Sequence, residues 1–271
     1  MRISSVHNPR LKAAARLRDH AERRRSGRTL VDGLREIACA LRHAGCVESL
    51  FCLPEACTSD QHQRLLREAA GQGAVCYELS EAAFRRLAYG ERGDGMVAVV
   101  RCPVASLEQL ASAGRPLVVV LEAVEKPGNI GAVARTVDAT GGALIIADGR
   151  TDIFNPNAIR ASLGTLFTIP VAEGTSTEVR RWLEQHDYRV VAAAVEAERI
   201  YWEVDLAGRT AFVLGSEAAG LSDCWKGAGI TPVRLPMRGA ADSLNVSVTA
   251  AVLAFEWCRQ SAAHTGQPPS R

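Results

Sequence analysis

The chain has 271 residues, of which 47% are hydrophobic and 23% charged. These values are typical of a globular protein with one large domain or two ordinary ones. The sequence has no apolar run of about 18 residues, which excludes a transmembrane helix, and its basic N-terminus lacks the apolar part of a secretory signal. The eight cysteines form no CxxC pair, so we expect no metal site and a reduced, cytoplasmic setting.

The formal net charge of +2 conceals a basic N-terminus, because residues 1–28 contain nine Lys or Arg and only two acidic residues. Such an excess marks either a solvated helix face or an arm that contacts the phosphates of a nucleic acid. For the second alternative, the candidate RNA contacts in this segment are Arg10, Lys12, Arg23 and Arg24.

The first elements in chain order suggest a small α/β unit. Residues 8–25 have a helical pattern, and from residue 34 to residue 103 helical and strand-like patterns alternate. The segment 106–116 follows, with a short helical pattern and then Gly and Pro, which often mark a boundary. We therefore predict two domains, residues 1–105 and 106–271.

Five later segments are apolar at almost every position, as strands buried on both faces are. They are 117–124, 143–149, 188–195, 210–217 and 230–237. Helical patterns follow at 129–140, 156–163, 176–187 and 243–260. This alternation predicts a doubly wound parallel α/β domain, in which ligands bind at the carboxyl ends of the strands. No GxxxxGK[ST] sequence occurs, and no GxGxxG follows a strand, so the usual nucleotide-binding loops are not indicated.

Polar residues follow two of these strands where packing alone would favour apolar ones. In the first segment, 125–142, Asn129 either caps the next helix or has a chemical role. Arg135 lies among small apolar neighbours, and its guanidinium suits a phosphate. In the second segment, 212–222, Glu217 is either a first-turn residue favoured by the helix dipole or a group that orients others.

The third polar segment opens the last helix. Residues 246–255 have an apolar helical pattern, and Asp242 or Ser243 would suffice to cap it. Asn245 is then predicted one turn inside a buried helix. A buried amide without a partner costs about 1–3 kcal/mol. We therefore expect Asn245 either to belong to a hydrogen-bond network or to face a ligand.

Taken together, the three segments carry N-x-G-x-x-x-R at 129–135, L-G-x-E-x-x-G-L at 214–221 and P-M-x-G-x-x-x-S-L-N-V-S at 236–247. These resemble, in order, the three motifs of the SpoU (TrmH-type) RNA 2′-O-ribose methyltransferases of the SPOUT superfamily. The resemblance extends to 155–171, which the family places beside the active site. The first hundred residues more loosely resemble an L30e-like substrate-binding domain.

The resemblance implies a parallel α/β fold with a C-terminal deep trefoil knot, an exception to the rule against knots, which forms the S-adenosylmethionine pocket. It implies a catalytic and positioning cluster of Asn129, Arg135, Glu217, Ser243 and Asn245. It implies that backbone groups of Gly215, Leu235 and Leu244 hold the cofactor, with Val195, Pro236 and Met237 around it. Family members act as homodimers whose active site is completed across the interface.

The role of Arg135 is left with two alternatives. It either removes the proton of the 2′-hydroxyl or holds a phosphate, and an Arg pKa above about 12 makes it a poor base. Arg160 would contact either RNA or the neighbouring subunit. No part of this chemistry requires a metal.

The expected function is therefore cytoplasmic 2′-O-methylation of structured RNA. Ribosomal RNA, and 23S rRNA in particular, is favoured over tRNA because residues 1–105 resemble a ribosomal-protein-like module. The alternatives are a tRNA 2′-O-methyltransferase, a methyltransferase that acts on a base nitrogen, and a non-catalytic RNA-binding or ribosome-assembly protein with the same fold. The presence of Arg135, Glu217 and Asn245 argues against the last of these.

Overall fold

The computed structural model describes residues 1–88 and 94–265. Contacts within the chain divide it into two compact units. The first comprises Met1–Pro103 together with Phe154–Thr168, and the second comprises Val104–Ile153 together with Ile169–Arg271. The first unit thus takes in a segment from the middle of the chain. In the described part of the chain, no helix is long and apolar enough to cross a membrane.

The first unit contains a five-stranded sheet with the order β1-β4-β3-β5-β2. Its strands are β1 (Arg2–Ile3), β2 (Arg28–Asp32), β3 (Val47–Cys52), β4 (Val75–Leu79) and β5 (Met96–Arg101). Strand β5 is antiparallel to both of its neighbours, and the other pairs are parallel. The sheet is therefore mixed.

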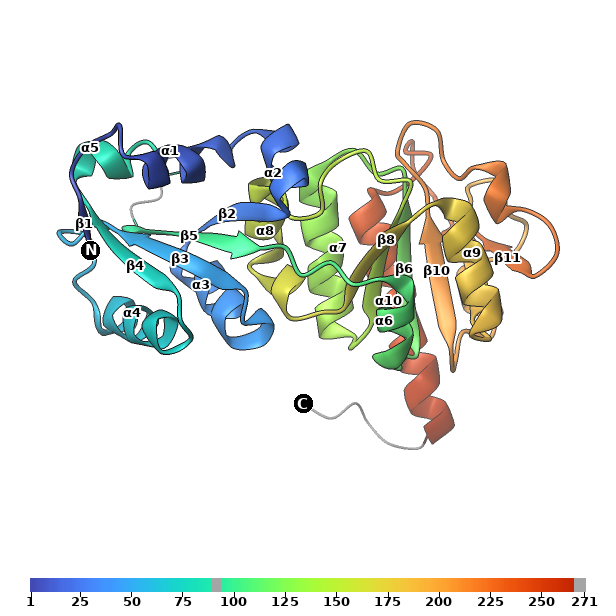
Figure 1. Cartoon of the computed structure of the whole chain (residues 1–271). Helices are drawn as coiled ribbons and strands as arrows, with labels where there is room; N and C mark the ends of the chain where they lie inside the picture. The colour runs from blue at the N-terminus through green and yellow to red at the C-terminus, as the bar shows by residue number, and fades with distance from the viewer. Residues whose placement is uncertain (89–93, 266–271) are drawn as a thin grey trace. The chain divides into compact units, whose positions relative to one another are not determined.

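Helices cover both faces of this sheet. They are α1 (Pro9–Arg16), α2 (His20–Ser26), α3 (Leu34–Cys39), α4 (Asp60–Gly71), α5 (Glu81–Phe84) and α8 (Pro156–Ser162), with a π-helical turn at Ala40–Ala44 and a 3-10 turn at Thr165–Phe167. Figure 1 shows α1 and α5 on one face and α3 and α4 on the other. The sequence predicts one helix over 8–25, but the structure has two because Asp19 caps α2 by accepting hydrogen bonds from the N–H groups of Ala21 and Glu22.

The segment Phe154–Thr168 is attached to the first unit by specific contacts. The Thr29 hydroxyl donates a hydrogen bond to the carbonyl oxygen of Phe154 at 2.8 Å. Arg160 Nη2 forms an ion pair with Asp32 Oδ2 at 2.6 Å. Both contacts involve β2, so this strand explains why a segment distant in sequence packs with the first unit.

The second unit contains a six-stranded sheet with the order β11-β9-β10-β6-β7-β8, and all of its strands are parallel. The strands are β6 (Leu117–Glu122), β7 (Ala143–Ala147), β8 (Val171–Gly174), β9 (Arg189–Ala193), β10 (Thr210–Leu214) and β11 (Ile230–Val233). Every residue of β6, β7 and β10 is buried, which confirms the prediction of a parallel sheet. Edge strand β8 was missed, because four residues are too few to show a periodic pattern.

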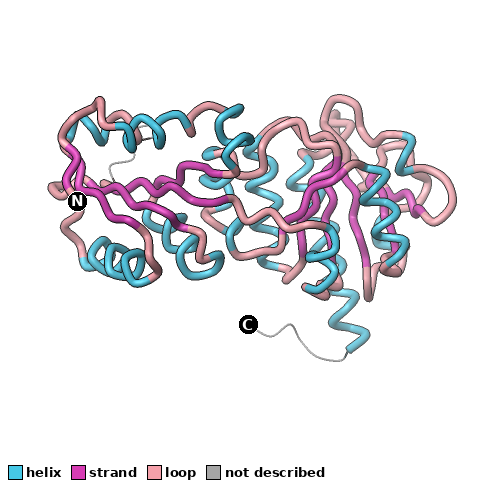
Figure 2. Tube along the Cα trace, in the orientation of Figure 1, coloured by secondary structure: helices cyan, strands magenta, loops and turns pink. Residues whose placement is uncertain are grey.

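Helices also cover both faces of the second sheet. They are α6 (Leu107–Ser112), α7 (Pro127–Ala139), α9 (Ser176–Gln185) and α10 (Val246–Thr265), with 3-10 turns at Tyr201–Glu203 and Asp223–Trp225. Helices α7 and α10 lie together on one face, and α9 lies on the other (Figure 1). The segments after β9, β10 and β11 are drawn mainly as loops in Figure 2. These loops leave the carboxyl edge of the sheet, which is where a ligand site is expected.

Candidate active site

A cavity of about 1070 Å³ lies among the loops that follow β9, β10 and β11. Five of the six predicted cofactor-binding residues line it: Val195, Gly215, Leu235, Met237 and Leu244. The sixth, Pro236, lies between two of these in the chain but is not part of the lining. The cavity therefore brings together residues from three separate loops of the second unit.

Gly215 allows the loop after β10 to fold back on itself. The N–H of Gly220 donates to the carbonyl oxygen of Ser216 at 3.0 Å. A Cβ atom at position 215 would lie 2.2 Å from the carbonyl carbon and oxygen of Gly220 and 2.6 Å from the nitrogen of Leu221. Since these are backbone atoms, no side-chain rotation would relieve the overlap. Gly215 is thus required by this turn, and the turn forms part of the cavity wall.

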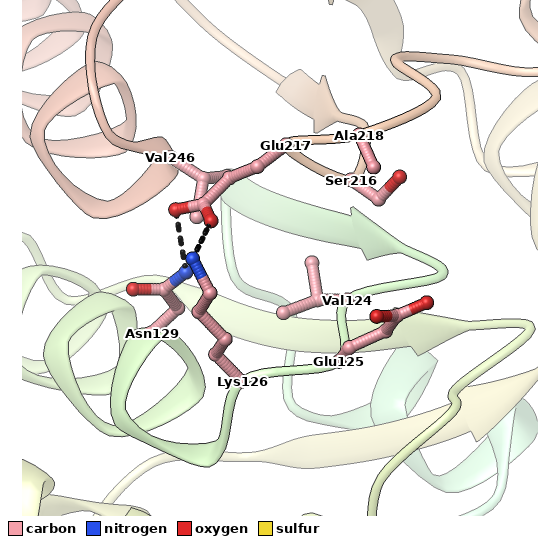
Figure 3. Close-up of a pocket in the computed structure, with 8 residues that line it drawn as sticks. All are labelled: Val124, Glu125, Lys126, Asn129, Ser216, Glu217, Ala218 and Val246. Carbon is pink, nitrogen blue, oxygen red and sulfur yellow. Dashed lines mark hydrogen bonds and ion pairs between the residues drawn. The ribbon is translucent and has the colours of Figure 1, made fainter.

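A smaller cavity of about 300 Å³ adjoins the first and shares Ser216, Glu217, Ala218 and Val246 with it. The side chains of Lys126, Asn129 and Glu217 point toward one another there (Figure 3). Lys126 Nζ forms an ion pair with Glu217 Oε2. The Nδ2 group of Asn129 donates to Glu217 Oε1 at 3.1 Å. Glu217 is thereby fixed against the first turn of α7.

Asn245 completes this cluster from the start of α10. Its Nδ2 group donates to Glu217 Oε1 at 2.8 Å and to Asn129 Oδ1 at 3.3 Å. Its Oδ1 atom accepts from the N–H of Ser247 at 2.9 Å and from the Ser247 hydroxyl at 2.6 Å. The bonds to Ser247 orient the amide, because they occupy the oxygen and leave the Nδ2 group toward Glu217.

The position of Asn245 corrects one sequence expectation. The helix begins at Val246 and not at residue 243, so Asn245 is an exposed capping residue and is not a buried amide one turn inside the helix. The expectation that Asn245 belongs to a hydrogen-bond network is nevertheless met by its bonds to Glu217 and Asn129. Asn129 is not a cap, since α7 begins at Pro127.

Sequence analysis missed Lys126 as a member of this cluster. The ammonium of Lys126 and the amide of Asn129 lower the pKa of the Glu217 carboxyl below its ordinary value, because both stabilise the carboxylate. The only signal in the sequence is a cation directly before the Pro-Gly turn. Nothing local to Lys126 indicates that Glu217, 91 residues later, lies beside it.

The remaining two predicted catalytic residues lie apart from this cluster. Ser243 lines the larger cavity. Arg135 is on α7, six residues or about 9 Å along the helix from Asn129, and it lines neither cavity. It is exposed, and its guanidinium has no hydrogen-bond or ion-pair partner within residues 1–88 and 94–265. Arg135 is therefore available to an external anion.

The predicted RNA contacts lie in the first unit and are not equivalent. Arg10, Lys12 and Arg24 are exposed. Arg23 is only 6% exposed, and its Nη1 group donates to the carbonyl oxygens of Leu17 at 3.0 Å and Arg18 at 2.8 Å.

Two of these predictions need correction or qualification. Arg23 is not a candidate RNA contact, because its buried guanidinium bonds to the carbonyl groups that follow α1 and so connects α1 to α2. Arg160 is half-buried in its ion pair with Asp32, so its charge is largely compensated within the first unit.

Among the described residues, no group of three or more His, Cys, Asp and Glu side chains is placed to hold a metal ion. All eight cysteines are free thiols.

Comparisons with known proteins cover both units. Residues 116–255 match the sequence model of the SpoU rRNA Methylase family, and residues 8–98 match that of the MRM3-like substrate binding domain. The 23S rRNA (guanosine(2553)-2′-O)-methyltransferase RlmP of Bacillus subtilis is 30% identical over 93% of this chain and 97% of its own length. The 23S rRNA (uridine(2479)-2′-O)-methyltransferase of Streptomyces viridochromogenes is 30% identical over 91% of this chain and 88% of its own length.

One solved structure is similar to this chain over most of its length. It is the SpoU methyltransferase AviRb from Streptomyces viridochromogenes in complex with the cofactor AdoMet. The two chains are 28% identical and superimpose with a TM-score of 0.83, over 94% of this chain and 98% of the other. The similarity therefore extends over both units and does not rest on the motifs alone.

Proposed function

Because this chain belongs to the SpoU rRNA methylase family, we propose that it transfers a methyl group from S-adenosylmethionine to a ribose 2′-hydroxyl of ribosomal RNA, with 23S rRNA as the favoured substrate. The observation that carries this proposal is the cluster of Asn129, Glu217 and Asn245 beside the large cavity, because each residue comes from a different motif. The two relatives are equally similar in sequence to this chain, but they are named for different nucleotides of 23S rRNA. We therefore propose the class of RNA substrate for this chain and not the nucleotide.

The larger cavity fits S-adenosylmethionine. Its volume of about 1070 Å³ is ample for a ligand of that size, since small-molecule pockets are commonly about 300–1,000 Å³. Trp225, one of the lining residues, has a buried indole N–H with no hydrogen-bond partner among the described residues. The cofactor supplies a methyl group already activated by its sulfonium. Backbone groups of Gly215, Leu235 and Leu244 would hold the cofactor, with Val195 and Met237 around it and Pro236 outside the lining.

The polar cluster would position the ribose. Glu217 is held as a carboxylate by Lys126 and the two asparagines, so these donors are fixed before the substrate arrives. Fixed alignment of a nucleophile and an electrophile can contribute about 7–11 kcal/mol in well-oriented cases. Ser243, which lines the larger cavity, would also contact the ribose.

Arg135 would hold a phosphate of the substrate. Its guanidinium is exposed and has no partner in the described part of the chain. A guanidinium does not give up its proton readily in proteins, so an arginine is a poor general base. A bound guanidinium instead stabilises negative charge that develops on the 2′-oxygen, and so makes loss of the hydroxyl proton easier.

We also propose a homodimer that completes the active site. Val248 and Phe255 of α10 are 46% and 56% exposed, and their seven-residue spacing places them on one face of the helix. Exposed apolar side chains on one face favour burial against another surface. A second copy covering this face would also bring another chain close to α7, which packs against α10 and carries Arg135.

The finer architecture is proposed on the same basis. Residues 1–105 would bind RNA through Arg10, Lys12 and Arg24, and residues 106–271 would form the methyltransferase domain. The chain after β11 runs beside the loop after β9. The N–H of Arg234 donates to the carbonyl oxygen of Arg199, and the N–H of Tyr201 donates to the carbonyl oxygen of Arg234. The C-terminal knot itself is proposed from the chain's membership of the family. For a protein that modifies rRNA, we propose a cytoplasmic location.

The test is transfer of labelled methyl groups from S-adenosylmethionine to separated rRNA and tRNA, followed by alkaline hydrolysis. A 2′-O-methyl group removes the nucleophile needed for cleavage, so label recovered in alkali-resistant dinucleotides of rRNA would support the proposal. Label in mononucleotides would indicate base methylation, and label in tRNA alone would reject rRNA as substrate. Normal cofactor binding without label in any RNA, including rRNA from assembling ribosomes, would favour a binding protein.

A further inference from the structure

Glu122, the last residue of β6, has a buried carboxylate that the proposed chemistry does not use. The residue is 3% exposed. Its Oε1 atom accepts hydrogen bonds from the Ser222 hydroxyl at 2.6 Å and the Ser176 hydroxyl at 2.7 Å, and its Oε2 atom accepts from the N–H of Ser222 at 2.8 Å. A buried carboxylate is costly unless such bonds satisfy it, so these contacts are needed for Glu122 to remain in place.

The two serines connect Glu122 to different parts of the second unit. Ser176 is the first residue of α9, which covers one face of the sheet. Ser222 follows directly after the loop 215–221, every residue of which lines the larger cavity. Ser222 uses both its N–H and its hydroxyl on Glu122, so the end of this loop is tied to β6 by a two-point contact.

The middle of the loop is anchored by the Glu217 side chain, which contacts Lys126, Asn129 and Asn245. Its backbone hydrogen bonds are internal, from the N–H groups of Ala219 and Gly220 to the hydroxyl and carbonyl oxygens of Ser216. Leu221 packs against the core, whereas Ala218, Ala219 and Gly220 are exposed. The start of the loop is held because β10 pairs with β6, and the contact of Ser222 with Glu122 holds its end to the same strand.

We propose that Glu122 is a positioning residue for methyl transfer. It holds the loop 215–221 in place through Ser222. The anchored loop preserves the shape of the cavity wall and keeps Glu217 directed toward Asn129 (Figure 3). Glu122 lines neither cavity, so its influence on a bound cofactor must pass through the loop. The link to the cofactor rests on the proposed function, whereas the link to the loop does not.

The test compares Ser222→Ala with Ser176→Ala. Each change removes one hydroxyl that donates to the same oxygen of Glu122 over nearly the same distance, but only Ser222 adjoins the loop. Using the serines also avoids leaving a neutral or shortened side chain at the buried position 122. Amide hydrogen exchange of residues 215–222 in the unliganded protein reports the loop, calorimetry reports the Kd for S-adenosylmethionine, and thermal unfolding reports the stability of each variant.

We expect Ser222→Ala to accelerate exchange in the loop and to weaken cofactor binding by about fivefold, as the loss of one hydrogen bond implies. Ser176→Ala should change loop exchange and Kd by less than about twofold, even where its loss of thermal stability is similar. Equal effects of the two variants on the loop, or no effect of Ser222→Ala, would overturn the proposal. If the wild-type protein did not bind S-adenosylmethionine, the proposed function would fail, and the exchange measurements would still decide whether Glu122 holds the loop.

Discussion

Replacing Gly215 with alanine places a methyl group where the folded loop has no room. The new Cβ atom would lie 2.2 Å from the carbonyl carbon and oxygen of Gly220, well inside van der Waals contact. Because the opposing atoms are backbone, the loop between residues 215 and 221 must move. Overpacking that forces such shifts costs about 1–3 kcal/mol. If the displaced loop must return to its original shape to bind the cofactor, this free energy corresponds to a loss of affinity of about 5- to 150-fold.

The assay for this prediction is calorimetric titration of Gly215→Ala with S-adenosylmethionine, together with its thermal unfolding. Gly71→Ala is the matched control, because Gly71 ends α4 in the first unit, outside the cavity lining, and a Cβ atom there would meet nothing within 4 Å. We expect the control to bind as the wild-type protein does. Wild-type affinity and stability in Gly215→Ala would refute the reasoning, since the loop would then tolerate the atom that its geometry excludes.

Three further predictions concern individual side chains. Arg135→Ala should abolish methyl transfer but leave the Kd for S-adenosylmethionine within about twofold, because the residue lines neither cavity; a folded variant that no longer binds the cofactor would contradict this. Glu217→Gln should lower stability at neutral pH, since the pKa of Glu217 is lowered in the folded protein and its carboxylate therefore stabilises the fold above its unfolded pKa. The difference between wild type and this variant should shrink as the pH falls through the folded pKa of Glu217, and denaturant titrations showing a constant difference from pH 7 to pH 3 would be inconsistent with that linkage. Arg23→Ala should lower stability by about 1–3 kcal/mol because it leaves buried carbonyl groups without their donor. Arg24→Ala should leave stability unchanged, because Arg24 is exposed, but should weaken RNA binding and make it less dependent on salt concentration. Chemical unfolding and RNA titrations at several salt concentrations separate the two, and equal loss of RNA affinity in both variants at full stability would argue against the structural role of Arg23.

The positions of Lys126 and Asn245 explain how the proposed site is prepared before substrate binds. Asn245 is oriented by its bonds to Ser247, and its Nδ2 group then reaches Glu217. Lys126 neutralises the same carboxylate from the loop after β6. One acidic residue thus joins the ends of two helices, α7 and α10, which pack against each other. The cost of holding these polar groups together is met by mutual hydrogen bonds, as is usual for a polar network.

The sequence by itself determined the fold class and the residues of the three motifs. Strands such as β6 and β10 are buried on both faces, and their continuous apolar runs predict a parallel sheet without knowledge of its order. The motif positions placed Asn129 and Glu217 after the ends of strands, but they placed Asn245 one turn inside the last helix, where the structure makes it the cap. Their predicted catalytic roles stay predictions, although their proximity is now a structural fact. Gly215 was also recognisable from the motif, because a backbone turn that excludes Cβ can be met only by glycine.

Only the tertiary structure decided which side chains meet. The strand order β11-β9-β10-β6 brings the loop after β10 beside the loop after β6, and this places Glu217 next to Lys126 and joins Ser222 to Glu122. Sequence periodicity reports which face of one element is buried, but it carries no information about which element lies next to it. The burial of Arg23 was hidden for the same reason, since an arginine in a basic segment has the same local pattern whether it meets solvent or two backbone carbonyl groups.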